Sequence, residues 1–189
     1  LIAKGMGGSI AMIDTERESA SLYCDLCEFN TLNLDPPYRP ERFIEAIKLA
    51  ESEGHDIIII DSATHEWSGS GGCTELNQML ADTQFKGNTW AAWSQTTPRH
   101  RAFIDAILHS KCHVIATFRS KTETVQENGR VRKVGMKDEA RDGTEYEFTT
   151  VLNIEHTTHL ATVSKDRTGL FKDPELITED TGRKLREWL

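Results

Sequence analysis

The stretch Asp56-Ile57-Ile58-Ile59-Ile60-Asp61-Ser62 decides the expected fold of this chain. Successive side chains of a strand point to opposite faces of the sheet, so four consecutive isoleucines place apolar groups on both faces. A strand that is apolar on both faces lies inside a sheet covered by helices on each side, as in the parallel sheets of α/β proteins. The sequence therefore predicts a central strand that ends in the carboxylate of Asp61.

Further strands and helices are predicted to alternate around this strand. Apolar runs at residues 9–14, 29–34 and 112–118 predict three more strands. Helices are predicted over residues 41–54 and from Thr97 onward, since a proline such as Pro98 suits the first turn of a helix. This alternation predicts right-handed crossovers and a mainly parallel sheet.

The last third of the sequence predicts antiparallel additions to that sheet. Residues 122–126 and 130–134 flank Asn128-Gly129, a dipeptide that favours a tight hairpin turn. Two more strands, at residues 146–154 and 160–164, precede a short helix at the end of the chain. We therefore expect an α/β fold with antiparallel strands in its C-terminal part.

Length and composition bound the possible functions. A chain of 189 residues fits one α/β core, so we expect a single domain over residues 1–189. The net charge of −8 argues against a generally basic nucleic-acid-binding protein, so contact with nucleic acid must rest on a local cluster. No apolar run approaches the roughly 20 residues that cross a bilayer, and we expect a cytoplasmic protein without a membrane partner.

Cysteine usage gives a weak metal signal. Cys24 and Cys27 have metal or redox spacing, but no second such pair completes a four-ligand zinc set. The favoured interpretation is that all the cysteines are free thiols.

Acidic residues follow two of the predicted parallel strands. Asp14-Thr15-Glu16 follows the first strand, and Asp61 ends the central one. In α/β sheets ligands bind at the carboxyl ends of the strands, where we expect these carboxylates to lie together. Asp61 is the predicted Mg²⁺ ligand, directly or through a water. The alternative is that the strand simply ends in a polar residue.

A general base is predicted beside the metal ligand. Ser62 follows Asp61 directly and has no carboxylate, so Glu16 is the candidate that orients an attacking water. His65-Glu66 provides a second candidate base, ranked lower. The alternative for Glu16 is a solvated pair with Arg17.

Two cations follow the predicted strand at residues 160–164. Lys165 and Arg167 lie two positions apart on an extended segment, so their side chains face the same way. Together they are able to contact a phosphate bound by an adjacent subunit. Ordinary surface charge is the alternative.

Taken together, several phrases resemble the RecA-like P-loop ATPase core, in its order along the chain. They occupy residues 10–17, 57–62, 113–117 and 163–167. Residues 19–23 and 141–148 more closely resemble phage-encoded, AAA-type RecA-like ATPases associated with recombination and single-strand annealing. The resemblance implies a RecA-like three-layer sandwich that binds ATP and Mg²⁺. It also implies a homo-oligomer that acts on single-stranded DNA in the cytoplasm of a bacterial host.

The resemblance assigns roles to individual residues. Glu16 falls on the water-activating glutamate, and Asp61 on the Walker B aspartate. Thr117 ends the strand that carries a phosphate-sensing residue. Lys165 and Arg167 resemble the paired cations inserted into a neighbour's site. The expected catalytic residues are thus Glu16, Lys165 and Arg167, and the expected nucleotide-binding residues are Asp61, Ser62 and Thr117.

One departure from the family pattern is the phosphate-binding loop. No GxxxxGK[ST] occurs in the 189 residues, although this loop holds the β- and γ-phosphates in P-loop enzymes. We expect a chain truncated before residue 1, and we expect this stretch alone to bind ATP poorly. The alternative is a non-catalytic nucleic-acid-binding or assembly module that keeps the fold without nucleotide.

The most basic stretch lies between residues 119 and 143, where the resemblance places DNA-contacting loops. The expected nucleic-acid-binding residues are Arg119, Lys121, Arg130, Arg132 and Lys133. Acidic residues are interleaved with them, so a solvated hairpin is the alternative. Trp67, Trp90 and Trp93 flank the glycine-rich residues 68–72, and packing in a core or interface is their expected role.

Overall fold

The computed structural model describes the backbone of residues 1–127 and 130–189, and the side chains outside residues 122–136. A four-stranded sheet lies at its centre, in the order β2-β1-β3-β4. Every pairing within this sheet is parallel. The strands are β1 (Ile10–Asp14), β2 (Asn30–Asn33), β3 (Ile57–Asp61) and β4 (His113–Ala116). The predicted α/β fold with a parallel central sheet is confirmed.

Strand β3 occupies the central position that its isoleucines predict. It pairs with β1 on one side and β4 on the other. Ile58 and Ile60 pack into the core on one face of the sheet, and Ile57 belongs to a separate apolar cluster on the other face. All three are fully buried. The run of four isoleucines thus supplies both faces of the sheet, as the alternation of side chains requires.

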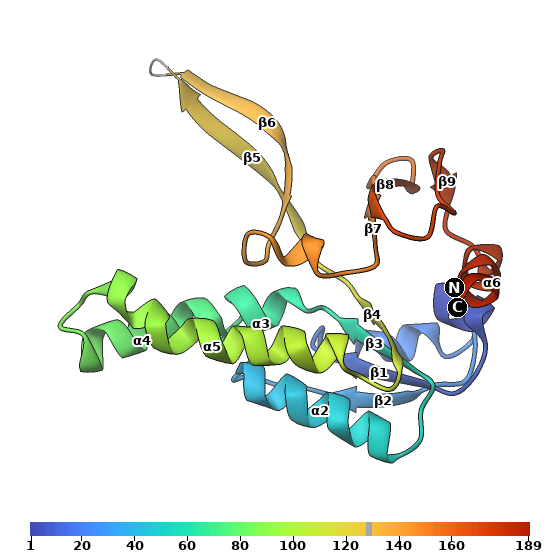
Figure 1. Cartoon of the computed structure of the whole chain (residues 1–189), viewed down its shortest axis with the longest axis horizontal. Coiled ribbons are helices and arrows are strands. Elements are labelled where there is room, and N and C mark those ends of the chain that lie inside the picture. Colours follow the sequence, from blue (N-terminus) through green and yellow to red (C-terminus); the bar gives the residue numbers. More distant parts are fainter. Residues whose placement is uncertain (128–129) are drawn as a thin grey trace.

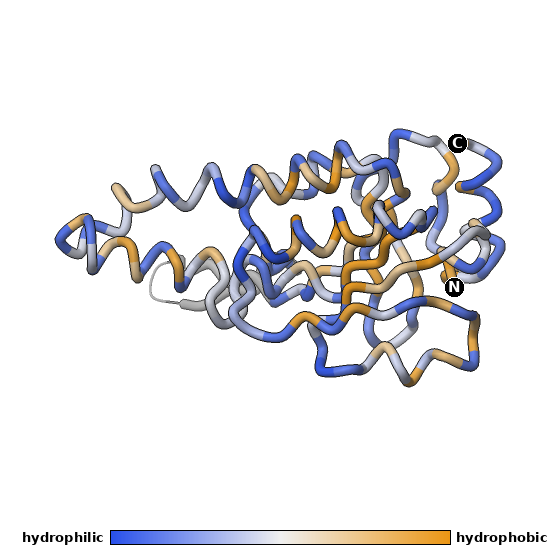
Figure 2. Tube along the Cα trace, turned by 90° about the horizontal axis from the view of Figure 1, so that it is seen from below, coloured by the Kyte–Doolittle hydropathy of each residue, from blue (hydrophilic) through white to orange (hydrophobic). Residues whose placement is uncertain are grey.

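One face of the sheet is covered by α2 (Pro40–Ser52) and α5 (Thr89–Leu108). Phe43 of α2 and Phe103 of α5 meet with ring centroids 5.3 Å apart, and both are almost completely buried. Figure 2 shows the apolar residues concentrated along the central strands and the polar residues towards the periphery. Most of the apolar core therefore lies between the sheet and these helices.

The opposite face is covered where α1 (Ile2–Met6) crosses α6 (Glu179–Trp188). The two helices approach so closely that a Cβ atom on Gly182 would overlap the carbonyl oxygen of Ile2. A Cβ atom on Gly5 would likewise overlap the carbonyl oxygen of Glu179. Both ends of the chain therefore lie on the same side of the molecule, at this crossing (Figure 1).

A helical arm extends beyond the sheet (Figure 1). It consists of α4 (Cys73–Gln84) and the first half of α5, and the short helix α3 (Thr64–Ser68) lies at its base. The prediction that a helix begins at Thr97 is wrong. Helix α5 begins at Thr89, where Asn88 accepts a hydrogen bond from the amide of Ala91, and Pro98 lies inside the helix. Packing of the arm carries the helix through the proline, because Ala92 is fully buried against α4.

Antiparallel strands form the C-terminal part, as predicted, but they form two separate sheets and do not extend the central one. A long hairpin of β5 (Ser120–Glu127) and β6 (Arg130–Asp138) projects away from the sheet (Figure 1). The predicted turn at Asn128-Gly129 lies outside the described residues. A three-stranded sheet of β7 (Thr150–Ile154), β8 (Leu160–Asp166) and β9 (Glu175–Leu176) follows. Strand β7 begins later than predicted, because residues 144–146 form a 3-10 turn.

In the part of the chain that the structure describes, no helix combines the length and the apolar character needed to cross a membrane.

Candidate active site

The acidic ends of β1 and β3 emerge at the same edge of the sheet. The two strands are parallel neighbours, with Asp14 in register with Asp61. The pairing continues one residue further, because the amide of Thr15 donates to the carbonyl of Asp61 over 2.8 Å. The residues that follow both strands are thereby held side by side, at the edge where α/β sheets bind ligands.

A buried contact between Thr15 and Ser62 fixes the two loops to each other. The amide of Ser62 donates to Thr15 Oγ1 over 2.8 Å, and this hydroxyl donates to the carbonyl of Ser62 over 3.1 Å. Both residues are 2% exposed. Buried polar groups that are fully paired hold one arrangement, so the positions of Glu16 and Asp61 are set by this contact.

The carboxylate of Glu16 lies in a polar cluster at this edge. Arg119 donates to both of its oxygens, with 2.5 Å between Nη2 and Oε1. Ser62 Oγ donates to Oε1 over 3.2 Å, and His65 Nδ1 lies 4.0 Å from the same oxygen. Burial acts to raise the pKa of Glu16, but the hydrogen bond and charge of Arg119 outweigh it, so the pKa lies below its ordinary value. Glu16 is therefore an ionised acceptor at neutral pH.

Asp61 is partly exposed and is held by the neighbouring strand. Thr117 directly follows β4, and its hydroxyl donates to Asp61 Oδ1 over 2.6 Å. The carboxylate of Asp61 and the hydroxyl of Ser62 are oxygen ligands of the kind that Mg²⁺ prefers. The donor set at this edge therefore fits the predicted metal.

Asp14 departs from the expectation that it would join the exposed carboxylates. It is 1% exposed, and its oxygens accept hydrogen bonds from the amides of Glu16, over 2.6 Å, and Ala20, over 2.8 Å. The loop that it shapes includes Arg17 and Glu18, which both have positive φ angles. Asp14 thus supports the loop that carries Glu16, and both of its carboxylate oxygens are occupied by amides of that loop.

His65 and Glu66, the lower-ranked candidate bases, lie in two different environments. His65 lies at the site, where its Nδ1 is 2.7 Å from Thr15 Oγ1 and its ring stacks on Tyr38 with centroids 4.8 Å apart. Burial lowers the pKa of His65, and the nearby charge of Arg119 lowers it further, against the opposing effect of Glu16. Glu66 is 1% exposed and contacts Cys73 and His100, so it is not available as a base at this edge.

The predicted cations Lys165 and Arg167 lie on a different part of the chain. Both donate to the carbonyl oxygen of Tyr146, Arg167 over 3.3 Å. Within the residues that the structure describes, neither forms a hydrogen bond or ion pair with Glu16 or Asp61. Their proposed role at an adjacent subunit's site stays a prediction.

The residues predicted to bind nucleic acid are separated in the structure. Arg119 pairs with Glu16 and thus lies in the candidate active site. Lys121 is exposed near the base of the projecting hairpin. The side chains of Arg130, Arg132 and Lys133 lie outside the described residues. The prediction of a basic DNA-binding hairpin is therefore untested.

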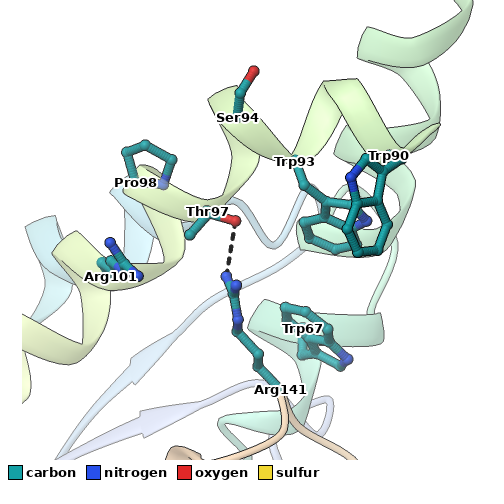
Figure 3. A pocket seen from close by; sticks show the side chains of 8 residues that line it. All are labelled: Trp67, Trp90, Trp93, Ser94, Thr97, Pro98, Arg101 and Arg141. Atoms are coloured by element: carbon teal, nitrogen blue, oxygen red, sulfur yellow. Dashed lines mark hydrogen bonds between the residues drawn. The ribbon is translucent and has the colours of Figure 1, made fainter. Parts of the chain in front are cut away.

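A tryptophan-rich pocket lies between α3 and α5 (Figure 3). The rings of Trp67 and Trp93 stack with centroids 5.4 Å apart, and Trp90 is 86% exposed. The guanidinium of Arg141 lies 6.0 Å from the centre of the Trp93 ring and donates to Thr97 Oγ1 over 2.9 Å. The pocket has a volume of about 560 Å³ and is lined by Trp67, Trp90, Trp93, Ser94, Thr97, Pro98, Arg101 and Arg141.

The sequence contains a signal for this pocket that the predicted helix start at Thr97 hides. Its lining residues on α5 recur at intervals of three or four between positions 90 and 101, which is the spacing of one helical face. Placing the start of the helix at Thr97 divided that face in two. An uninterrupted helix from Thr89 would have shown it.

Comparison with known proteins agrees with this architecture. A family model described as an AAA domain matches residues 2–178. A search of curated proteins gives no match to the chain. The family match spans both the parallel sheet with its acidic edge and the antiparallel strands that follow. The chain therefore belongs to the AAA domain family and forms a nucleotide-binding, ATPase-like core.

Proposed function

We propose that this chain is the catalytic core of an ATPase that acts on single-stranded DNA as a homo-oligomer. We further propose that it serves phage recombination or replication in the bacterial cytoplasm, which the resemblance of residues 141–148 to phage-encoded ATPases supports. The observation that carries the proposal is the convergence of Glu16, Asp61 and Thr117 at one sheet edge.

Asp61 and Ser62 are the proposed Mg²⁺ ligands. The hydrogen bond from Thr117 orients the carboxylate of Asp61, and the buried contact with Thr15 fixes the backbone of Ser62. When bound, Mg²⁺ neutralises charge on the phosphate oxygens of ATP. Thr117 is accordingly a positioning residue for Asp61 as well as a candidate contact for phosphate.

Glu16 is the proposed acceptor for the attacking water. Its lowered pKa makes it a weak base but keeps it ionised, so its contribution is to orient the water by accepting a hydrogen bond. Arg119 holds the carboxylate in place and brings a positive charge to the position where phosphate is expected. The hydrogen bond to the water and the ion pair with Arg119 both require that the carboxylate of Glu16 is ionised.

The test of this role is Glu16→Gln in the natural full-length polypeptide that holds these residues. Turnover of ATP is expected to fall by roughly 10²–10⁴-fold, the usual contribution of a positioned acid or base. Binding of a fluorescent ATP analogue is expected to persist, because glutamine keeps the volume and the hydrogen-bonding groups. Glu18→Gln, in the same loop but exposed, is the matched control. Unchanged turnover in Glu16→Gln would remove Glu16 from the mechanism.

A non-catalytic nucleic-acid-binding or assembly module that keeps the fold without nucleotide is the second candidate. The two functions differ in one measurement. An ATPase core binds nucleotide in a Mg²⁺-dependent manner, and Asp61→Asn weakens that dependence. A module of the second kind binds its partner equally well with and without nucleotide.

The proposed DNA contact is supported by the tryptophan-rich pocket. Stacked and exposed indole rings offer faces to unpaired bases, and Arg101 and Arg141 bring positive charge to the same surface. This combination of aromatic faces with cations suits single-stranded nucleic acid, whose bases are free to stack.

Replacement of Trp90 by alanine tests this contact. Affinity for a fluorescent single-stranded oligonucleotide is expected to fall by roughly 1–3 kcal/mol, the usual cost of losing one stacked base. Trp90 is 86% exposed, so the fold is expected to tolerate the change. The control is Trp188→Ala, which removes a partly exposed tryptophan from α6. Equal affinities of the two variants would exclude stacking on Trp90.

A further inference from the structure

Three buried side chains with metal-ligating atoms meet at the base of the helical arm. Glu66 comes from α3, Cys73 from the first position of α4, and His100 from the middle of α5. They are 1%, 0% and 5% exposed. Residues from three different helices thus converge on one small volume that solvent scarcely reaches.

The ligand atoms of this cluster lie at separations close to those of a tetrahedral zinc site. Cys73 Sγ lies 3.0 Å from Glu66 Oε1, and His100 Nδ1 lies 3.0 Å from Glu66 Oε2. All three ligand atoms lie within 4.8 Å of one another. Bonds of about 2.0–2.3 Å to a tetrahedral zinc ion separate ligand atoms by about 3.3–3.8 Å. Shifts of less than roughly 1 Å therefore convert the observed arrangement into a coordination shell.

The charge of Glu66 provides a second argument. A carboxyl group buried to this extent is stable when it is paired with a cation, bound to a metal or neutral. Arg99 is the neighbouring cation, but it is paired with Glu41 through two hydrogen bonds of 2.5 and 2.8 Å. In the described part of the chain, the side chain of Glu66 is hydrogen-bonded to Cys73 and His100 alone. A divalent cation would compensate both the carboxylate and the thiolate that remains when Cys73 loses its proton.

We propose that Glu66, Cys73 and His100 bind a zinc-class divalent cation that fastens the helical arm to α3. Cysteine sulfur, histidine nitrogen and glutamate oxygen are the ligand types that Zn²⁺ takes in proteins, and three protein ligands leave a fourth position for water. Trp67 packs edge-on against the ring of His100, with centroids 5.3 Å apart, and Trp67 also stacks on Trp93. The cation would therefore hold the base of the tryptophan-rich pocket.

The competing explanation is a metal-free network in which a protonated His100 pairs with Glu66 and the thiol of Cys73 donates to the same carboxylate. Both explanations account for the burial and the contacts. They differ in whether the full chain binds one equivalent of metal, and in whether metal stabilises it.

Cobalt is a suitable probe because its bond to a thiolate absorbs in the near ultraviolet. The full chain, stripped with a chelator, is titrated with Co²⁺, and one equivalent with a thiolate-to-cobalt band is expected. Zn²⁺ is expected to displace the cobalt. Cys73→Ser should abolish the band and weaken Zn²⁺ binding by roughly tenfold or more, since even indirect partners of metal ligands contribute that much. Competition with a chromogenic chelator measures the affinity for Zn²⁺.

The chain offers a matched control for this titration. The double variant Cys24→Ser/Cys27→Ser removes the CxxC pair, and it is expected to keep the cobalt band and the Zn²⁺ affinity. Loss of the band only in this double variant would assign the metal to the CxxC pair and overturn the proposal. The absence of a band in the unmodified chain would overturn it equally.

Stability gives an independent outcome if Cys73→Ser does not fold. Glu66→Gln keeps the size and the hydrogen-bonding groups of the side chain but removes the anionic ligand. Equimolar Zn²⁺ is expected to raise the melting temperature of the unmodified chain and to leave that of Glu66→Gln nearly unchanged. Equal effects of Zn²⁺ on the two proteins would contradict the site. None of these measurements involves nucleotide, so their result is independent of the proposed ATPase activity.

Discussion

Glu16 and Arg119 show what a sequence does and does not reveal about a single residue. The position of Glu16 was predictable, because it follows an apolar strand, and parallel strands end at a common edge. Its ion pair with Arg119 was not, because the partner lies 103 residues further along the chain. The basic stretch around Arg119 predicts a contact with DNA instead. A long-range ion pair of this kind depends on where the residues after β4 lie in the folded chain. The amino-acid composition carries no information about their position.

His65 illustrates the same point and gives a pH-dependent prediction. Its pKa is lowered in the folded chain, mainly by burial, so the folded state favours the neutral ring. The unfolded chain takes up this proton at a higher pH, near the ordinary value of about 6.5. The contribution of His65 to the free energy of unfolding is therefore complete above a pH of about 6.5. This contribution is lost as the pH falls from there towards the pKa of the folded state.

The corresponding experiment is urea unfolding at pH 7.5 and 5.5. His65→Gln does not titrate and can still hydrogen-bond to Thr15, so it should lose less unfolding free energy between the two pH values than the unmodified chain. His156→Gln, in an exposed turn, serves as the control. Identical pH dependence of the unmodified chain and His65→Gln would show that this histidine contributes nothing to the acid sensitivity.

At the scale of elements, the central strands are predictable from local apolar runs, whereas the helical arm is not. Cys73, Leu76, Leu80 and Ala81 have the spacing of one helical face, but the proline inside α5 favours a helix start at Thr97, which hides the partner of that face. The arm is stabilised by an apolar cluster of Leu76, Leu80, Ala81 and Ala92 that is shared between its two helices, which no single helix reveals. Tertiary packing overrides the local preference for ending a helix at a proline.

The crossing of α1 and α6 gives a prediction at this scale. Gly182→Ala places a methyl group against the backbone of α1, which cannot move away without disturbing the sheet that it covers. Overpacking of this kind typically costs about 1–3 kcal/mol of unfolding free energy. Arg183→Ala, on an exposed position of the same helix, should change it by less than about 0.5 kcal/mol. Chemical denaturation measures both, and equal stabilities would disprove the close contact.

At the scale of the whole molecule, the proposed oligomer makes a testable demand. If Arg167 acts at a neighbour's site, Glu16→Gln and Arg167→Ala each inactivate a homogeneous assembly. Mixing the two inactive proteins creates some interfaces with an intact Glu16 on one subunit and an intact Arg167 on the other. With random mixing of equal amounts, roughly a quarter of the interfaces combine an intact Glu16 with an intact Arg167. ATPase activity should then reappear at roughly a quarter of the unmodified level. Mixtures that stay inactive would place Arg167 outside a neighbour's site.

The packing of α1 against α6 also suggests that the chain tolerates circular permutation. Because both ends lie on the same side of the molecule, a flexible peptide linker that spans the separation between N and C in Figure 2 would join residue 189 to residue 1 without crossing the sheet. New ends could then be opened at the tip of the arm, where Lys86 and Gly87 form an exposed turn with positive φ angles. The same packed core would be reached from a permuted polypeptide, with the acidic edge of the sheet intact.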